Sequence, residues 1–239
     1  MNRLANSWKA AAAVAGLSIV SQIAMGANAV LTVRIDGLDA GGRFADAAAF
    51  CPPAGAPKKD VSPGVSWSAG PAGTQSYVVL MTDPDVPKDF GSINKAGVAI
   101  PADAPRISVF HWVLADIPPT IMSLAAGVES QGPTPGGKPI GPTSHGLRGA
   151  NAYTMFLAKV EGMAGTYGGY DGPCPPVNDE RVHHYTIRVV ALDVKTLGLA
   201  GPFGGEAVEK AMVGHVLASG ESVASYSLNP ALVEKAGAK

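Results

Sequence analysis

The chain has 239 residues, with 18 Lys and Arg and 19 Asp and Glu side chains, a formal net charge of −1 and 46% hydrophobic residues. This near-neutral balance excludes the basic footprint of a nucleic-acid-binding protein, and the length is sufficient for one domain with a sizeable core. The 30 glycines and 20 prolines separate strong apolar segments, so we expect them in turns rather than in disordered regions.

The first 29 residues have the pattern of a secretory signal peptide. Arg3 and Lys9 precede an apolar stretch of about a dozen residues, and Ala27-Asn28-Ala29 forms a small-x-small cleavage site. A membrane anchor is the alternative, but the stretch is shorter than the roughly 20 residues that span hydrocarbon. We therefore expect an exported protein, periplasmic or secreted, whose mature chain (30–239) is one domain without a membrane span and carries 16 basic and 19 acidic side chains.

The chain contains two cysteines, Cys51 and Cys174. Export would place them in an oxidising compartment, where paired cysteines form disulfides. One disulfide between them is the simplest expectation, and two separate thiols are the alternative.

Four segments have the composition of β-strands: 30–36, 76–83, 107–117 and 184–194. The first alternates apolar and other residues, and the other three are rich in β-branched and aromatic residues and bounded by Pro or Gly. Loops rather than alternating helices lie between them, which disfavours a parallel sheet. The pattern predicts a mainly antiparallel β architecture.

Two further segments have helical patterns. Residues 151–162 lack internal Gly and Pro, and residues 204–220 have apolar positions near helical spacing, although Gly214 interrupts them. Residues 221–228 are predicted to form a last strand. The Gly- and Pro-rich stretch 131–146 is predicted to be a long loop, either functional or mobile.

Histidines in the predicted strands are candidates for chemistry. By the alternation of side chains along a strand, His111 would be buried on the face that carries Val109 and Val113. By the same rule, His183 and Tyr185 share a face, and His184 lies on the other one.

A second group of candidates lies in turns. Asp83 and Asp85, separated by Pro84, would point the same way if the segment is extended, and Pro87 would stiffen the turn. In the loop 167–176, closely spaced Gly and Pro residues would let the backbone amides of residues 172 and 174 approach a bound group.

These motifs together resemble the phosphatidylethanolamine-binding protein family, in its bacterial, Raf-kinase-inhibitor-like branch. The resemblance is carried by DPDVP (83–87), VFHWVL (109–114), GPCPP (172–176) and HHYTIRVVALD (183–193) in the same order, and FCPP…VSPGVSW (50–67) and GHVLASG (214–220) extend it. It implies a large antiparallel sheet packed on a smaller one, with a few short peripheral helices and an anion pocket at one end.

The resemblance also implies which residues line that pocket: Asp83, Asp85, His111, Gly172, Pro173, His183 and Tyr185. A cis bond before Pro87 is a further implication, as cis bonds occur almost only before proline. In one departure from the family pattern, His184 stands where relatives have Arg, which removes a guanidinium fork from this position.

The sequence thus predicts a protein that binds a small anion, such as a phosphate, a phosphoryl head group or a carboxylate, and that could modulate a protein partner. Like charges repel, so two carboxylates in such a pocket require that a histidine or an Asp takes up a proton with the ligand. We expect no cofactor, no bound metal and no catalytic residue. The alternatives are a protease- or kinase-inhibitor-like interaction protein, or a metal-assisted hydrolase that uses the Asp and His residues.

Overall fold

The structure is a computed structural model that describes residues 29–237, so the predicted signal peptide lies, except for Ala29, outside the described residues. The strands are β1 (Ala29–Val30), β2 (Val33–Ile35), β3 (Val65–Trp67), β4 (Ser76–Pro87), β5 (Arg106–Ile117), β6 (Ser123–Leu124), β7 (Gly141–Pro142), β8 (Leu147–Arg148), β9 (Gly169–Tyr170), β10 (His183–Leu192) and β11 (Val216–Tyr226). The helices are α1 (Tyr153–Phe156), α2 (Gly205–Ala211) and α3 (Pro230–Gly237), with 3₁₀ turns at Asp46–Ala48 and Phe90–Ser92.

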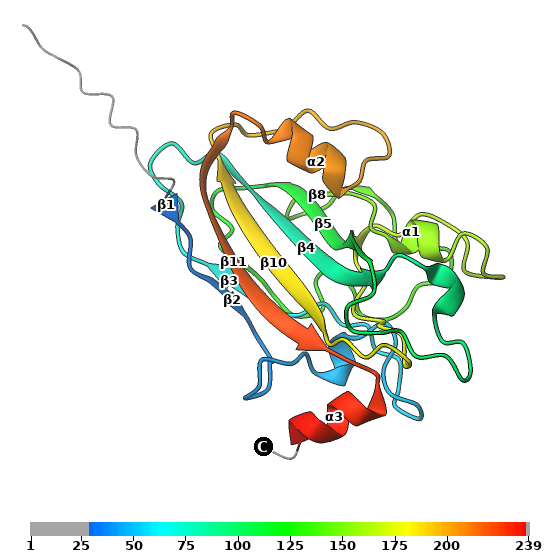
Figure 1. Ribbon diagram of the computed structural model, residues 1–239. Coiled ribbons are helices and arrows are strands. Elements are labelled where there is room, and N and C mark those ends of the chain that lie inside the picture. Colours follow the sequence, from blue (N-terminus) through cyan, green and yellow to red (C-terminus); the bar gives the residue numbers. More distant parts are fainter. Residues whose placement is uncertain (1–28, 238–239) are drawn as a thin grey trace, which may run out of the picture.

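Four long strands form the centre of the molecule. Within the described residues, the large sheet has eight strands in the order β1-β11-β10-β4-β5-β8-β7, with β9 paired to β5. The long strands β11, β10, β4 and β5 lie side by side, and each runs antiparallel to its neighbour (Figure 1). Their branched and aromatic residues suit a pleated surface that is buried on both faces. The predicted strands at 76–83, 107–117 and 184–194 and the mainly antiparallel β class are confirmed.

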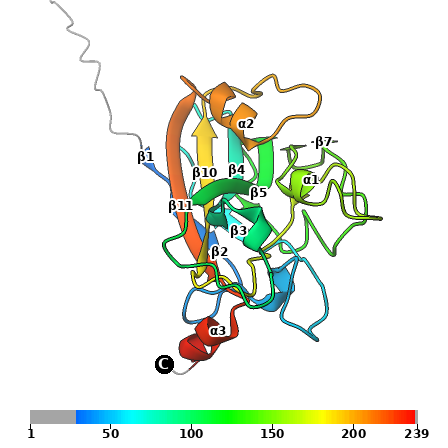
Figure 2. The ribbon, with the colours of Figure 1, turned by 45° about the vertical axis from the view of Figure 1, so that its right-hand side comes forward.

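The two faces of the large sheet are covered by different layers. One face packs on a three-stranded sheet in the order β2-β3-β6, and the core between the sheets contains Trp67, Trp112 and Tyr185. The other face packs on α2, where Val208 and Met212 contact Val113 and its neighbours. Figure 2 shows α2 at the upper end of the sheet, away from the lower end that carries α3. The lower end of β10 and β4 is therefore not covered by α2.

The predicted strand 30–36 is divided between the two sheets. Its first part, β1, lies beside β11 in the large sheet, and β2 pairs with β3 in the small sheet. One short segment thus links the layers at the edge of the sandwich.

The helix predicted for 151–162 is largely wrong. Only Tyr153–Phe156 is helical, and turns follow as far as residue 163. Residues 158–162 are exposed, so the segment has no continuous apolar face to bury, and short helices without such packing are unstable in water.

The helix predicted for 204–220 ends early, at Ala211. Gly214 has φ +86°, which ends the helical path, and β11 starts at Val216 rather than at residue 221. The last strand is thus confirmed but is longer than predicted, because residues 216–220 gain ladder partners in β10.

Candidate functional site

His111 lies at a bulge in β5. Phe110 and Trp112 pair with consecutive residues of β4, so His111 between them is an extra residue without a partner. The bulge breaks the period of two, and His111 contacts Tyr185 in the core between the sheets, whereas Val113 faces α2. The predicted burial of His111 is confirmed, since it is 3% exposed, but the prediction that it shares a face with Val113 is wrong.

Asp83 lies close to two of the predicted site residues, His183 and His111. Its Oδ2 lies 2.7 Å from His183 Nδ1 and 3.9 Å from His111 Nε2. These three buried side chains come from β4, β10 and β5, which are neighbours in the large sheet. Tyr185 lies beside them with its ring centroid 5.2 Å from that of His111, and its hydroxyl is buried without a hydrogen-bond partner among the described residues. Asp83, His111, His183 and Tyr185 therefore form one cluster.

Asp85 does not belong to this cluster. A second bulge, between Asp83 and Val86, turns Asp85 away from Asp83. Its carboxylate accepts hydrogen bonds from the backbone and the ring of His184 over 2.9 and 3.0 Å and forms an ion pair with Arg181. The prediction that Asp83 and Asp85 point the same way is therefore wrong, because it assumed an unbroken strand.

Pro87 is the last residue of β4 and pairs with Arg106 of β5. None of the described peptide bonds is cis, so the expected cis bond before Pro87 is not present. The chain remains extended through this position instead of making the tight turn that a cis bond would serve.

Two residues that the sequence did not indicate complete the cluster. Asp179 lies 3.2 Å from His183 Nε2, and the guanidinium of Arg106 binds both oxygens of Asp179 over 2.5 and 3.0 Å. This fork geometry makes a strong charge-assisted pair. Arg106 thus supplies a guanidinium close to His183 although His184 occupies the position of the family's Arg. Asp179 lies four residues before His183, and this spacing is only a weak signal that the two side chains meet. Nothing in the sequence near Arg106 indicates that it lies close to His183.

The hydrogen bonds of His183 define its charge. Both ring nitrogens face carboxylates, which only accept hydrogen bonds, so both must carry protons. Burial by itself lowers the pKa of His183, but the hydrogen bonds and charges of Asp179 and Asp83 outweigh it and raise the pKa to about 9. Burial likewise opposes ionisation of Asp179, yet His183 and Arg106 lower its pKa to about 2. His183 is therefore a cation at neutral pH.

His111 has the opposite character. Its Nδ1 lies 2.9 Å from the backbone oxygen of Asp171 and donates a hydrogen to it. Burial lowers the pKa of His111, and the charge of Asp83 opposes this only in part. At neutral pH the ring is therefore uncharged, and Nε2, the nitrogen nearer to Asp83, carries a lone pair.

Gly172 and Pro173 are buried and do not line the cavity beside the cluster. The amide of Gly172 donates to Asp60 Oδ1 over 2.8 Å, and its carbonyl accepts from the hydroxyl of Tyr153 over 2.6 Å. Burial and the charge of Asp171 raise the pKa of Asp60 to about 8 despite this hydrogen bond. The Gly172 amide is thus engaged inside the protein rather than free to contact a ligand, and its loop is held by a buried polar network.

A cavity of about 640 Å³ opens above the cluster. Its lining consists of Phe50, Cys51, Asp83, Val86, Pro87, Phe90, Ile93, Asn94, His111, Tyr153, Met155, Phe156, Leu157, Ala158, Lys159, Cys174, Pro176 and His183. Asp83, His111 and His183 are the buried polar groups among these residues, and most of the wall is apolar. Concave apolar sites with a few convergent polar groups are typical of small-molecule binding sites.

The Cys51–Cys174 disulfide is present, as predicted, and lines this cavity. It joins residues 123 apart in sequence, and the amide of Cys51 donates to the carbonyl of Pro173 over 3.1 Å. The disulfide therefore ties the loop that contains Gly172 to the segment around Cys51.

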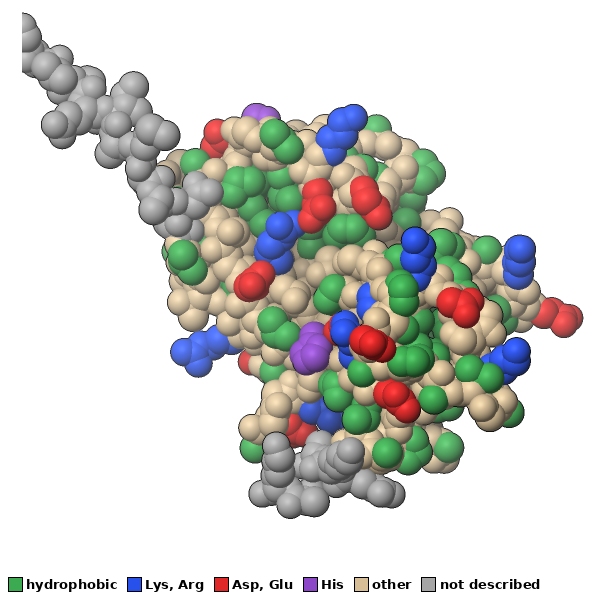
Figure 3. Space-filling view, in the orientation of Figure 1, with side chains coloured by type: hydrophobic (Ala, Val, Ile, Leu, Met, Phe, Trp, Pro, Cys, Tyr) green, Lys and Arg blue, Asp and Glu red, His purple; other side chains and the backbone are tan. Residues whose placement is uncertain are grey.

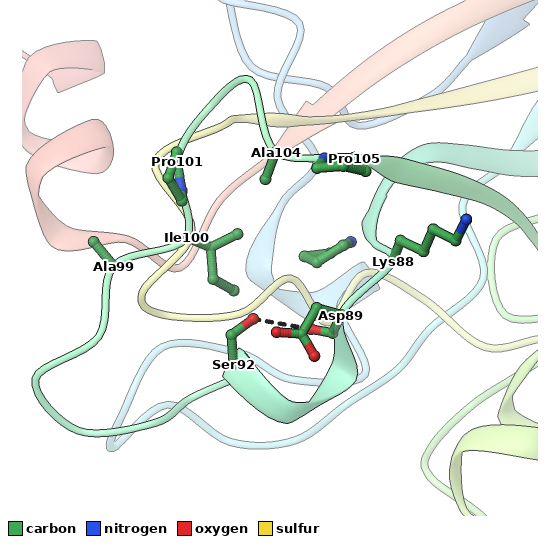
Figure 4. Close-up of a pocket in the computed structure, with 9 residues that line it drawn as sticks. Lys88, Asp89, Ser92, Ala99, Ile100, Pro101, Ala104 and Pro105 are labelled. Atoms are coloured by element: carbon green, nitrogen blue, oxygen red, sulfur yellow. Dashed lines mark hydrogen bonds between the residues drawn. The ribbon is translucent and has the colours of Figure 1, made fainter.

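A second cavity, of about 470 Å³, lies on the far side of Pro87. Figure 4 shows Ile100, Ala104 and Pro105 around it, with Ser92 hydrogen-bonded to the backbone of Asp89 at its edge. Its wall has no histidine and no paired charges. It therefore lacks the polar floor of the first cavity.

Residues 29–237 contain no group of three or more His, Cys, Asp or Glu side chains placed to hold a metal ion, and no helix with the length and hydrophobicity that crossing a bilayer requires. Figure 3 shows acidic and basic side chains intermixed on the visible face, without a patch of one sign.

Comparisons with known proteins agree with this fold. YbcL of Escherichia coli, described as a new member of the mammalian PEBP family, has 23% identity and a TM-score of 0.58, with 83% of this chain and 99% of that chain covered. A PEBP homolog from Chlamydia trachomatis has 22% identity and a TM-score of 0.56, with 84% and 99% covered. The fold is therefore that of a PEBP-type β-sandwich.

Sequence comparisons define the family. The family model for phosphatidylethanolamine-binding protein matches residues 38–227. A UPF0098 protein of Aquifex aeolicus is 31% identical over 170 residues, which cover 70% of this chain and 75% of the relative. UPF0098 protein PH1269 of Pyrococcus horikoshii is 31% identical over 167 residues, which cover 70% of this chain and 65% of the relative. The chain belongs to the phosphatidylethanolamine-binding protein family, as its motifs predicted.

Proposed function

We propose that this protein binds a small anionic group, a phosphate, a phosphoryl head group or a carboxylate, on the floor of the 640 Å³ cavity, and that it takes up a proton as it does so. The observation that carries the proposal is the convergence of Asp83, His111 and His183 under apolar walls. The family name, which refers to a ligand with a phosphoryl head group, supports the same class of ligand.

The charges beneath the cavity explain why a proton is needed. The two cations, His183 and Arg106, are matched by the two carboxylates Asp83 and Asp179. Both nitrogens of His183 are occupied by these carboxylates. An arriving anion therefore meets no uncompensated positive charge, and burying it unpaired would be costly.

His111 is the group that can supply the missing charge. His111 lines the cavity, its Nδ1 donates to the carbonyl of Asp171, and its other ring nitrogen, Nε2, carries a lone pair. An anion beside Nε2 would favour the protonated ring, which adds an N–H donor and a positive charge at the point of contact. Because the bound state then holds one more proton than the free state, affinity increases as the pH falls.

The test is the affinity for sulfate, which does not titrate between pH 5.5 and pH 8, measured by calorimetry alongside inorganic phosphate. One proton taken up changes affinity by about tenfold per pH unit over the titration range, so sulfate should bind at least about tenfold more tightly at pH 5.5 than at pH 8. His111→Gln should remove this difference. His184→Gln is the matched control, because His184 is exposed and bonded to Asp85 outside the cavity. Equal affinity at both pH values in the wild type would refute the proposal.

The disulfide supports a proposal about location. Disulfides persist in oxidising compartments, and the Cys51–Cys174 bond fits export by the predicted signal peptide. We propose that the protein acts in the periplasm or outside the cell. Cell fractionation with detection of the mature N-terminus tests this, and a full-length cytosolic form would contradict it.

A further inference from the structure

The cavity is much larger than the anionic group proposed to bind on its floor. A volume of about 640 Å³ holds roughly 20 water-sized groups, whereas a phosphate ion has five non-hydrogen atoms. The remaining space is bounded mainly by carbon atoms. A free inorganic anion would leave this apolar wall in contact with water.

Aromatic rings form a continuous path from the floor to the mouth. The ring centroids of His111 and Tyr153 are 5.6 Å apart, those of Tyr153 and Phe156 are 6.0 Å apart, and those of Phe156 and Phe90 are 5.8 Å apart. Phe50 joins this path at Tyr153, over 4.4 Å. These separations lie within the range at which aromatic rings attract each other.

The concentration of phenylalanine here is specific to this cavity. The chain has 6 phenylalanines, and Phe50, Phe90 and Phe156 all line the one cavity. Burial falls along the path, from Tyr153, which is 3% exposed, to Phe90, which is 47% exposed. Exposed apolar side chains at the rim of a cavity mark a binding surface.

The rim also carries a charge. Among the described residues that line the cavity, Lys159 is the only Lys or Arg, and it is exposed beside Phe156 and Leu157. A cation at the entrance favours the approach of an anion. The polar floor, the aromatic wall and the basic rim thus match a ligand that has an acidic group at one end and an apolar body.

We infer that the ligand is a small aromatic acid, whose phosphate or carboxylate lies by His111 and whose ring packs on Tyr153, Phe156 and Phe90. The inference rests on the proposed function and adds the class of the group that carries the anion. A ring is favoured over a flexible chain because it pairs with the rings of the wall and loses less freedom on binding.

The experiment compares inorganic phosphate, n-hexyl phosphate and phenyl phosphate by calorimetry at pH 6. The two organic ligands have equal numbers of carbon atoms, so they separate the effect of a ring from that of apolar mass. Phenyl phosphate should bind about threefold to tenfold more tightly than hexyl phosphate, as expected for one added aromatic contact. Equal affinities of these two ligands would overturn the inference.

Substitution of the two phenylalanines at the mouth of the cavity provides a second test. In Phe90→Leu/Phe156→Leu, phenyl phosphate should lose about threefold to tenfold in affinity, while hexyl phosphate and inorganic phosphate change little. Phe110→Leu is the matched control, because Phe110 packs under α2 outside the cavity. An equal loss for both organic ligands would overturn the aromatic preference.

The outcomes separate this inference from the proposed function. If inorganic phosphate and both esters bind alike and all depend on His111, the proposed function holds and the aromatic inference fails. If none of the three ligands binds, the proposed function fails. If benzyl alcohol binds as tightly as phenyl phosphate, the wall accepts rings but the anion site is refuted.

Discussion

The imidazole of His183 and the carboxylate of Asp83 form a buried ion pair with a separation of 2.7 Å. Asp179 holds the other nitrogen of the same ring, so His183 lies between two carboxylates. Removing one partner of such a pair leaves a buried charge without compensation, which is strongly destabilising. The pair therefore ties stability to the charge state of the cavity floor.

This pair predicts how stability depends on pH. Because the pKa of His183 is raised from 6.5 to about 9, its contribution is fully present below pH 6.5 and is lost as the pH rises through 9. The shift corresponds to a contribution on the order of 3 kcal/mol. Urea unfolding between pH 6 and pH 10 should show the wild type losing this stability relative to His183→Gln. Parallel curves for the two proteins would contradict the assignment.

The opposite orientation of Asp83 and Asp85 predicts different effects of two matched variants. Asp83→Asn should weaken sulfate binding, because Asp83 orients His183 and stabilises the protonated form of His111. Asp85→Asn should leave the affinity unchanged and lower the free energy of unfolding by about 1–3 kcal/mol through its hydrogen bonds to His184 and Arg181. Calorimetry and chemical unfolding of both variants check this. Tighter binding by Asp83→Asn would mean that Asp83 only repels the ligand.

The disulfide predicts an order of events on reduction. Cys51→Ser/Cys174→Ser should lose up to about 4–5 kcal/mol of stability, the value for a loop of this length in the chain-entropy model. Because the bond ties the Gly172 loop beside the cavity, ligand affinity should fall at reductant concentrations that leave the sheet folded. Calorimetry and circular dichroism over a reductant series measure the two events. Two alkylated thiols in unreduced protein would contradict the disulfide itself.

His145 has a structural role that can be tested without a ligand. Ser144 Oγ lies 3.4 Å from His145 Nδ1, and His145 Nε2 lies 2.5 Å from buried Glu129. His145→Ala should cost about 1–3 kcal/mol and speed hydrogen exchange in the loop 131–146. His215→Ala is the control: its pair with Asp193 is 43% and 45% exposed, and we expect a cost below about 1 kcal/mol. Equal costs would refute the anchoring role.

Sequence patterns predicted the central strands well and the directions of their side chains less well. The runs in β4, β5 and β10 are unmistakably strand-like, and the grouping of Asp83, His111 and His183 in one pocket was an implication of the family resemblance that their motifs carry. The faces of Val113 and Asp85 were predicted wrongly because each lies next to a bulge, where one extra residue reverses every later direction. The bulge at His111 has no local sequence signal such as a glycine, whereas Pro84 lies inside the second bulge, and proline within a strand is confined largely to sheet edges and bulges.

The sequence also did not predict which side chains pair over long separations in the chain. Arg106 and Asp179 are 73 residues apart, and their pairing depends on how β5 lies relative to the turn before β10. The helix predicted for 151–162 failed because local propensity says nothing about whether a face will be buried. Both misses reflect tertiary contacts that propensities do not contain.

The central claim is that His111 takes up a proton when an anion binds, and the ¹⁵N chemical shift of its Nε2 measures this directly. In free protein at pH 7, Nε2 should have the shift of an unprotonated nitrogen, with the proton on Nδ1 facing Asp171. Saturation with sulfate should move it to the shift of a protonated imidazolium. An Nε2 that stays unprotonated while sulfate binds would contradict the account.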